Sequence, residues 1–149
     1  MSLHATDILQ ITRQVMPRHA DFNLWDRAYS VPSLKWVTGP FAKYHFITRT
    51  PYAENRFDCE DLSLECAVMA RQLHAKSTQR LNALAFGWLI YTPDQLEANV
   101  QSTPGGAHCI NWFIAGKAGN ERVWFFEPQR SYTVNLSNDE INSIAAVYL

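Results

Sequence analysis

Residues 57–73, FDCEDLSLECAVMARQL, carry the clearest structural signal in this chain of 149 residues. Asp58 is suited to cap a helix, and apolar side chains follow it at Leu62, Cys66 and Met69. Because residues spaced by four and then three positions share one face of an α-helix, this pattern predicts a helix with one buried stripe. That stripe needs a covering layer from elsewhere in the chain.

Strand-like segments follow this helix and can supply the covering layer. Residues 82–91 form a bulky apolar run that predicts a buried strand, and residues 107–115 alternate as a half-buried strand does. A loop is expected over 92–106. A short turn leads from the second strand into 122–127, so these two strands are predicted to pair as an antiparallel hairpin, with a third short strand at 132–136. Helices followed by an antiparallel sheet indicate an α+β domain.

The flanking segments give weaker signals. Residues 6–16 predict an amphipathic helix, and the capping box at 137–140 predicts a last helix. The aromatic stretch 22–52 is interrupted by three prolines and predicts only a short helix near Trp36. A single domain over residues 1–149 is expected.

Composition limits the classes of function. Hydrophobic residues make up 47% and charged residues 18%, a balance that favours a packed interior over a disordered chain. The net charge of −1 gives no attraction to phosphate backbones or anionic lipid, so neither nucleic acid nor membrane is an expected partner. No signal peptide is recognised, and a soluble protein, cytoplasmic or phage-associated, is expected. A homodimer is compatible with the sequence.

The three cysteines, Cys59, Cys66 and Cys109, argue against a disulfide scaffold, because Cys59 and Cys66 are about 10 Å apart along one predicted helix. Cys66 and Cys109 are expected to be ordinary core residues. Cys59 falls in the first helical turn, where unpaired N–H groups favour a thiolate, and it is predicted as a nucleophile. The three cysteines and His108 have the chemistry of zinc ligands, but their spacing is not that of a zinc knuckle.

A nucleophile needs a base and a group that orients the base. His108 begins one strand of the predicted hairpin and Glu127 ends the other, so the two side chains are expected to be cross-strand neighbours. Taken singly, each residue has an ordinary explanation: a core cysteine, a strand histidine and a carboxylate paired with an arginine. Taken together, Cys59, His108 and Glu127 predict a catalytic triad that attacks a carbonyl.

Three segments also resemble a known family. Residues 57–64 (FDCEDLSL), 106–111 (GAHCIN) and 123–129 (VWFFEPQ) resemble the cysteine, histidine and acidic segments of papain-like and transglutaminase-like enzymes. They are most similar to the papain-fold domain at the C-terminus of certain fungal galactose-binding agglutinins and of some bacterial and phage proteins. The resemblance implies a papain-like or transglutaminase-like fold, in which the nucleophile helix packs on a small antiparallel sheet. It also implies a peptidase or amidase that acts on a peptide or protein through a thioester.

The same resemblance implies roles for four further residues. Gln129 and Tyr52 match positions that help to hold the oxyanion, although a phenol replaces the indole of the family at Tyr52. Glu60 and Asp61 match acidic positions that bind calcium in relatives. Two carboxylates alone do not supply the about six to eight oxygens that calcium takes. We expect that no cofactor is required and that calcium is a possible ion.

Three functions are compatible with these patterns. The first is a cysteine hydrolase, which the sequence favours. The second is a transglutaminase-like acyl transferase, in which an amine takes the acyl group. The third is a non-catalytic virion-associated or binding module that keeps the triad only as structure. In each case Trp25 and Trp36 are interpreted as pocket walls, and Trp88 as a core residue.

Overall fold

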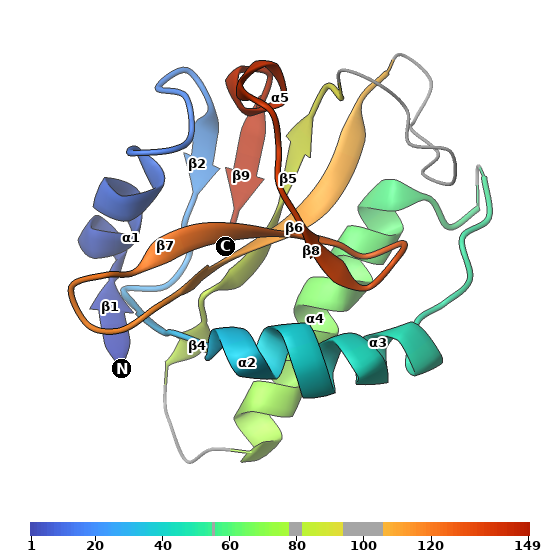
Figure 1. Ribbon diagram of the computed structural model, residues 1–149, viewed down its shortest axis with the longest axis horizontal. Coiled ribbons are helices and arrows are strands. Elements are labelled where there is room, and N and C mark those ends of the chain that lie inside the picture. Colours follow the sequence, from blue (N-terminus) through green and yellow to red (C-terminus); the bar gives the residue numbers. More distant parts are fainter. Residues whose placement is uncertain (55, 78–81, 94–105) are drawn as a thin grey trace.

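The computed structural model describes residues 1–54, 56–77, 82–93 and 106–149, so most of the predicted loop 92–106 lies outside the described residues. A mixed sheet in the order β2-β9-β5-β6-β7-β8 forms the centre (Figure 1). Its strands are β2 Asp21–Asn23, β5 Phe86–Tyr91, β6 His108–Ala115, β7 Arg122–Glu127, β8 Tyr132–Val134 and β9 Ala146–Tyr148. A smaller sheet joins β1 Ser2–His4, β3 Ala28–Ser30 and β4 Ala83–Leu84.

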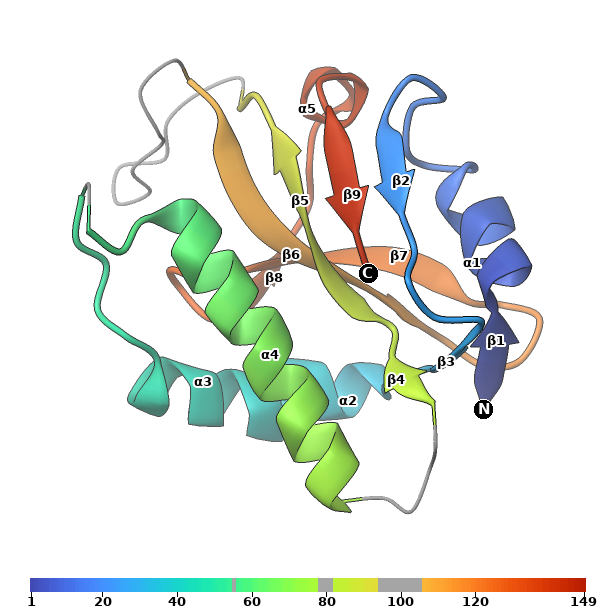
Figure 2. The same ribbon diagram turned by 180° about the vertical axis from the view of Figure 1, so that it is seen from behind.

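Helices cover both faces of the central sheet. They are α1 Ala5–Thr12, α2 Leu34–Trp36, the π-helical turn η1 Val37–Phe41, α3 Ala42–Thr48, α4 Cys59–Ser77 and α5 Asn138–Asn142. Helix α4 crosses one face, with α2 and α3 beside it (Figure 2). Helix α1 packs against the other face through Ile8. Among the described residues, no helix is both long enough and apolar enough to cross a bilayer.

The position of α4 is fixed by a polar contact as well as by its apolar stripe. Its small residues Ala67 and Ala70 are buried, which lets the helix approach the sheet closely. Asn111 on β6 is fully buried, and its Nδ2 donates to the carbonyls of Ser63 at 2.7 Å and Gly87 at 2.9 Å. The side-chain amide of Asn111 on β6 therefore links α4 to β5. This link fixes where the start of α4 lies relative to strands β5 and β6.

Strand β6 separates two apolar cores. All of its residues are buried, because both faces of the strand are covered. Trp112 and Ile114 belong to the core on the α1 side, whereas Phe113 and Ala115 belong to the core on the α4 side. The alternation of side chains along one strand thus accounts for both layers of packing.

The α+β class is confirmed, and three local differences from the sequence prediction have physical reasons. The sheet is mixed because β2 and β9 run parallel. The predicted capping box at Ser137 is present, but α5 ends at Asn142 and the chain continues as β9 between β2 and β5. The stretch 22–52 holds a helix through Pro40, because the π-helical turn at 37–41 tolerates the missing N–H of proline.

Candidate functional site

A buried polar cluster lies where α4 begins beside the ends of β6 and β7. His108 Nε2 lies 2.8 Å from Glu127 Oε2, and both side chains are almost fully buried. Cys59 is the first residue of α4, is fully buried, and has His108 as a direct charged neighbour. The structure therefore brings Cys59, His108 and Glu127 together.

The Cys59 and His108 pair is ionised as a thiolate and an imidazolium. The Cys109 thiol lowers the pKa of Cys59, burial opposes this, and His108 adds to the lowering, which leaves the pKa at about 4. Burial alone would lower the pKa of His108, but its contacts with Cys59 and Glu127 raise it to about 9. The imidazolium thus lies between two anions, which offsets the cost of burying its charge.

The Glu127 carboxylate is held by the turn that follows β7. The carboxylate Oε1 accepts a hydrogen bond from the backbone N–H of Gln129 at 2.9 Å. The backbone carbonyl of Glu127 accepts a second hydrogen bond, from the N–H of Ser131, at 2.7 Å. Ser131 has a left-handed backbone with φ 58°, and its Oγ lies 2.7 Å from Nδ1 of the buried His45. By holding Oε1, this turn fixes the orientation of the carboxylate and directs Oε2 toward His108.

The other predicted site residues surround this cluster. Gln129 is buried and bound to Glu127, as described above. Burial raises the pKa of the half-buried Tyr52, and the Cys59 thiolate adds to the rise, which places the phenol near Cys59. Glu60 Oε2 lies 3.4 Å from Cys59 Sγ. Among the described residues, Cys59, Glu60 and Cys109 place potential metal-binding atoms close together, and Asp61 is not part of this group. The calcium role predicted for Glu60 and Asp61 stays a prediction.

Cys109 is the member of the cluster that the sequence interpretation missed. Its Sγ lies within 4.8 Å of Cys59 Sγ and of a Glu60 oxygen, and the bond to Cys59 raises the pKa of the Cys109 thiol. The available signal was strand alternation, which places Cys109 on the same face of β6 as Phe113, toward α4. Cys66 is the fully buried core residue that was expected.

An aromatic pocket of about 320 Å³ lies outside this cluster, between α4, β5 and β9. Trp25 is 76% exposed at this pocket, which confirms its interpretation as a wall. The rings of Trp88 and Tyr148 stack with centroids 4.1 Å apart. Trp88 packs against the core, as predicted, and it also lines this pocket. Arg71 Nε donates to the carbonyl of Phe86 at 3.2 Å, which fixes the guanidinium. The full lining is Trp25, Leu64, Ala67, Val68, Arg71, Trp88, Tyr148 and Leu149.

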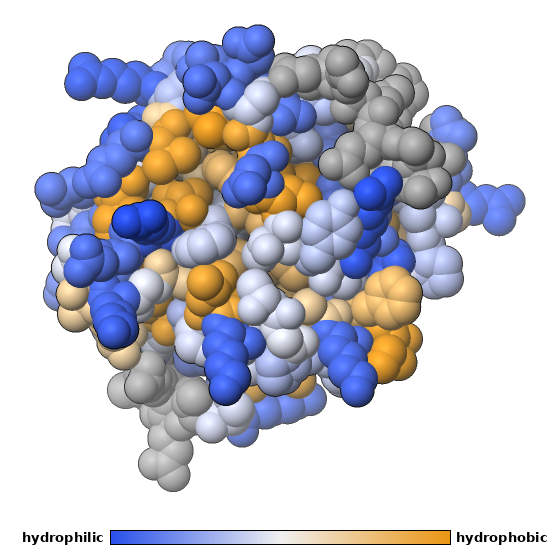
Figure 3. All heavy atoms as spheres, viewed as in Figure 1, coloured by the Kyte–Doolittle hydropathy of each residue, from blue (hydrophilic) through white to orange (hydrophobic). Residues whose placement is uncertain are grey.

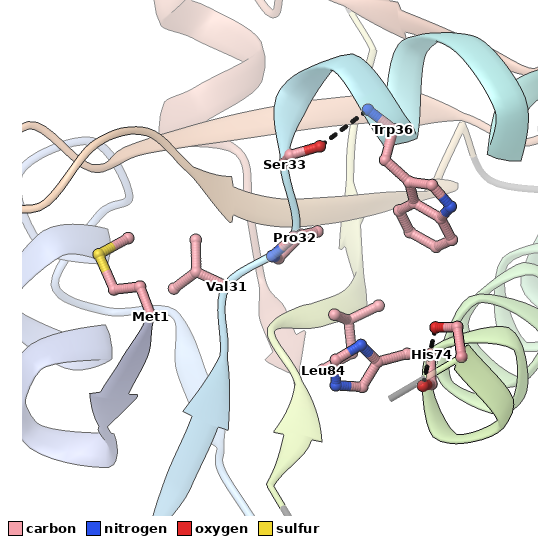
Figure 4. A pocket seen from close by; sticks show the side chains of 8 residues that line it. Met1, Val31, Pro32, Ser33, Trp36, His74 and Leu84 are labelled. Carbon is pink, nitrogen blue, oxygen red and sulfur yellow. Dashed lines mark hydrogen bonds between the residues drawn. The ribbon is translucent and has the colours of Figure 1, made fainter. Parts of the chain in front are cut away.

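Two further hollows offer fewer groups to a ligand. In Figure 4, Trp36 and His74 line a pocket of about 380 Å³, where the Trp36 ring stacks on Phe41 with centroids 5.1 Å apart. Ser33 Oγ, also in that pocket, already accepts from the N–H of Trp36 at 3.1 Å. Hydrophobic side chains gather between α5 and β7 in Figure 3, where a hollow of about 280 Å³ has Val123, Phe125, Val134, Leu136 and Ile141 in its lining.

Comparison with known proteins gives a likeness in fold. No family model matches the chain, and no curated protein matches it. The structure is similar to that of PSL1a in complex with E64, with a TM-score of 0.73. It is also similar to the Polyporus squamosus lectin bound to the glycan Neu5Acα2-6Galβ1-4GlcNAc, with a TM-score of 0.69. Each is 18% identical over 99% of this chain, and the chain spans about half of their lengths, 51% and 49%.

These neighbours correct the predicted family and activity. The solved structures that share the fold are of a lectin and give no support for a peptidase, so the predicted papain-like or transglutaminase-like membership and the hydrolase activity are wrong. The burial of the cluster agrees with this correction. Cys59, His108 and Glu127 are 0%, 1% and 3% exposed, which leaves little surface for a substrate. The fold itself brings these three side chains together.

Proposed function

We propose that the chain is a non-catalytic carbohydrate-binding module that takes a saccharide in the pocket between α4, β5 and β9. The observation that carries the proposal is an exposed indole, Trp25, beside the fixed guanidinium of Arg71 in one pocket. The lectin with a similar fold, whose structure holds a glycan, supports a saccharide as the ligand.

The aromatic side of this pocket suits the apolar face of a sugar ring. A pyranose presents C–H groups on one face and hydroxyls around its rim, so it binds best to an aromatic ring flanked by hydrogen-bonding groups. Trp25 offers such a ring at the surface, and the stacked pair of Trp88 and Tyr148 forms a second apolar wall. Large exposed aromatic surfaces of this kind are typical of binding sites.

Arg71 gives the pocket a preference for an acidic sugar. Only its Nε is engaged, by the carbonyl of Phe86, and its terminal amino groups form no hydrogen bond with any described residue. Burial lowers the pKa of Arg71, and Tyr29 and Asp26 raise it, but a guanidinium stays protonated in either case. Its planar donors match a carboxylate in a bidentate pair, so the carboxylate of a sialic acid is the expected partner.

A matched pair of glycans tests this proposal. We expect Neu5Acα2-6Galβ1-4GlcNAc to bind more tightly than Galβ1-4GlcNAc in calorimetric titration, because only the first carries a carboxylate. Trp25→Ala should weaken the binding of both glycans, since both lose the stacking surface. Arg71→Gln should remove the preference, a loss of about tenfold or more for the acidic glycan alone, as expected for a charge-assisted hydrogen bond.

The control is Trp36→Ala, which alters the pocket of Figure 4 and should leave both affinities unchanged. Failure of the unaltered protein to bind either glycan would contradict the proposal. So would rapid, selective reaction of Cys59 with iodoacetamide near pH 6 in the folded, metal-free protein. We expect Cys59 to react no faster than Cys66 and Cys109, because all three residues are at most 4% exposed and access limits their reaction.

A further inference from the structure

Two thiols and one carboxylate converge where α4 begins beside β6. The sulfurs of Cys59 and Cys109 and one oxygen of Glu60 all lie within 4.8 Å of one another, with 3.4 Å between Cys59 Sγ and Glu60 Oε2. In tetrahedral zinc sites, bond lengths of about 2.3 Å to sulfur and about 2.1 Å to oxygen place such ligands about 3.6 Å apart. We infer that Cys59, Cys109 and Glu60 bind a zinc ion.

The chemistry of the three ligands selects zinc over calcium. Calcium and magnesium take oxygen ligands, and two of the three atoms here are sulfurs. The sequence argued against zinc because Cys59 and Cys66 lack the spacing of a knuckle. The fold removes that objection, since Cys66 lies in the apolar core under α4 and Glu60 takes its place beside the two sulfurs. A helix start and a neighbouring strand hold the ligands here instead of one loop.

The surroundings of the three ligands also suit a cation. Nδ1 of His108 is buried and has no nitrogen or oxygen partner among the described residues, and the ring lies beside the sulfur of Cys59, while Nε2 is bound to Glu127. A histidine whose far nitrogen donates to a carboxylate is the usual arrangement among metal ligands, so His108 can complete the site once zinc binding displaces its proton. Glu60 is exposed, so an ion can enter from the surface on the side of that carboxylate.

Competition with a chromogenic zinc chelator tests the site on the metal-free full chain. We expect one zinc ion per chain, and cobalt in its place should show thiolate-to-metal charge-transfer absorption. Cys109→Ser should weaken zinc binding by at least about 100-fold, which is more than the loss of a residue that only hydrogen-bonds to a ligand causes. Glu60→Gln should weaken zinc binding by about tenfold. Two controls keep neighbouring chemistry intact: Cys66→Ser and Asp61→Asn should bind zinc as the unaltered protein does.

Equal zinc affinity in Cys109→Ser, or cobalt binding without thiolate absorption, would overturn the inference. Equal loss of affinity in Cys66→Ser would overturn it too, because Cys66 is outside the cluster. Circular dichroism and melting curves of the metal-free variants separate lost ligands from lost folding, and Cys109→Ala provides a second variant for that comparison. Titration of the same variants with Neu5Acα2-6Galβ1-4GlcNAc separates this inference from the saccharide proposal, since a lost zinc site should leave glycan affinity unchanged.

Discussion

At the scale of single residues, the neighbours of a buried group decide its charge more than the residue type does. His45 and His108 are both almost fully buried, at 0% and 1% exposure. Burial lowers the pKa of His45 to about 4, with help from the Arg49 cation, whereas two anions raise the pKa of His108 to about 9. Arg49 is close to His45 in the sequence, but the burial of His45 and the two anions beside His108 depend on distant parts of the chain, so the sequence alone could not assign the two charges.

The buried His45 makes stability depend on pH. Its pKa is about 4 in the folded chain and near 6.5 when unfolded, so the unfolded state binds more protons between these values. Stability is therefore lost as pH falls from 6.5 to 4, by about 3 kcal/mol for a shift of this size. His45→Gln removes this contribution, and the unfolding free energy from urea denaturation should fall less steeply in that pH window than it does in the unaltered protein.

The control for this measurement is His19→Gln, because His19 is exposed and should leave the pH dependence unchanged. If the pH dependence of the unfolding free energy were the same in His45→Gln, the pKa of His45 would not differ between the folded and unfolded states, which would contradict the prediction. Comparison with the unaltered protein at each pH cancels the contribution of the Cys59 and His108 pair, which is present in both chains.

At the scale of elements, local signals were sufficient where they existed. Helix α4 begins at Cys59, directly after the predicted cap, and β6 and β7 match the predicted hairpin. This explains why the meeting of Cys59, His108 and Glu127 could be predicted from the ends of those elements. Strand β9 has only three residues, and its pairing with β2 and β5 joins distant parts of the chain, so no local pattern indicated it.

The pocket proposed for the saccharide was out of reach for the same reason. Trp25, Arg71 and Tyr148 come from a loop after β2, from α4 and from β9. Only the exposed indole of Trp25 had a local interpretation, as a pocket wall. The guanidinium and the stacked ring pair become neighbours of Trp25 only when β9 is inserted into the sheet.

The insertion of β9 depends on a close approach at Gly87. A Cβ at this position would overlap the carbonyl oxygen of Tyr148 and lie 3.1 Å from the Cα of Leu149. Both are backbone atoms, so no rotamer change relieves the contact. Gly87→Ala is expected to displace β9 and to lower the unfolding free energy by about 3 kcal/mol or more, measured by urea denaturation.

Gly39→Ala is the matched control for Gly87→Ala. An added Cβ at Gly39 meets nothing within 4 Å, and the residue lies in a helical turn. Alanine there should be neutral or stabilise the protein by up to about 1 kcal/mol, because it reduces the freedom of the unfolded chain. Equal stability of the two variants would mean that β9 adjusts without loss of pairing.

At the scale of the whole molecule, one sheet links two cores and two candidate sites. The cores lie on opposite faces of β5, β6 and β7, with α4 on one side and α1 on the other. The proposed zinc ligands Cys59, Glu60 and Cys109 lie beside the start of β6, while the aromatic pocket lies beside β9. Shared strands make the cores one cooperative unit, whereas the separate linings allow each site to be altered alone.

Val147 tests whether the two cores unfold together. It is fully buried on the α1 side and pairs with Phe22 and Leu89. Val147→Ala removes two buried methyl groups and should lower the unfolding free energy by about 2 kcal/mol. Because the sheet is shared, hydrogen exchange should show the same loss at the most protected amides of α4, on the opposite face, as at those of β5.

The matched control is Val15→Ala, at a residue that is 38% exposed, where little change is expected at any amide. If the α4 amides of Val147→Ala kept the exchange free energies of the unaltered protein while those of β5 fell, the two faces would be separate folding units. In that case a ligand bound in the aromatic pocket, which touches both α4 and β9, would stabilise the molecule by joining the two units. If the α4 and β5 amides instead lose protection together, the sheet alone joins the two faces into one folding unit. A ligand in the aromatic pocket would then bind to a molecule that already folds as one unit.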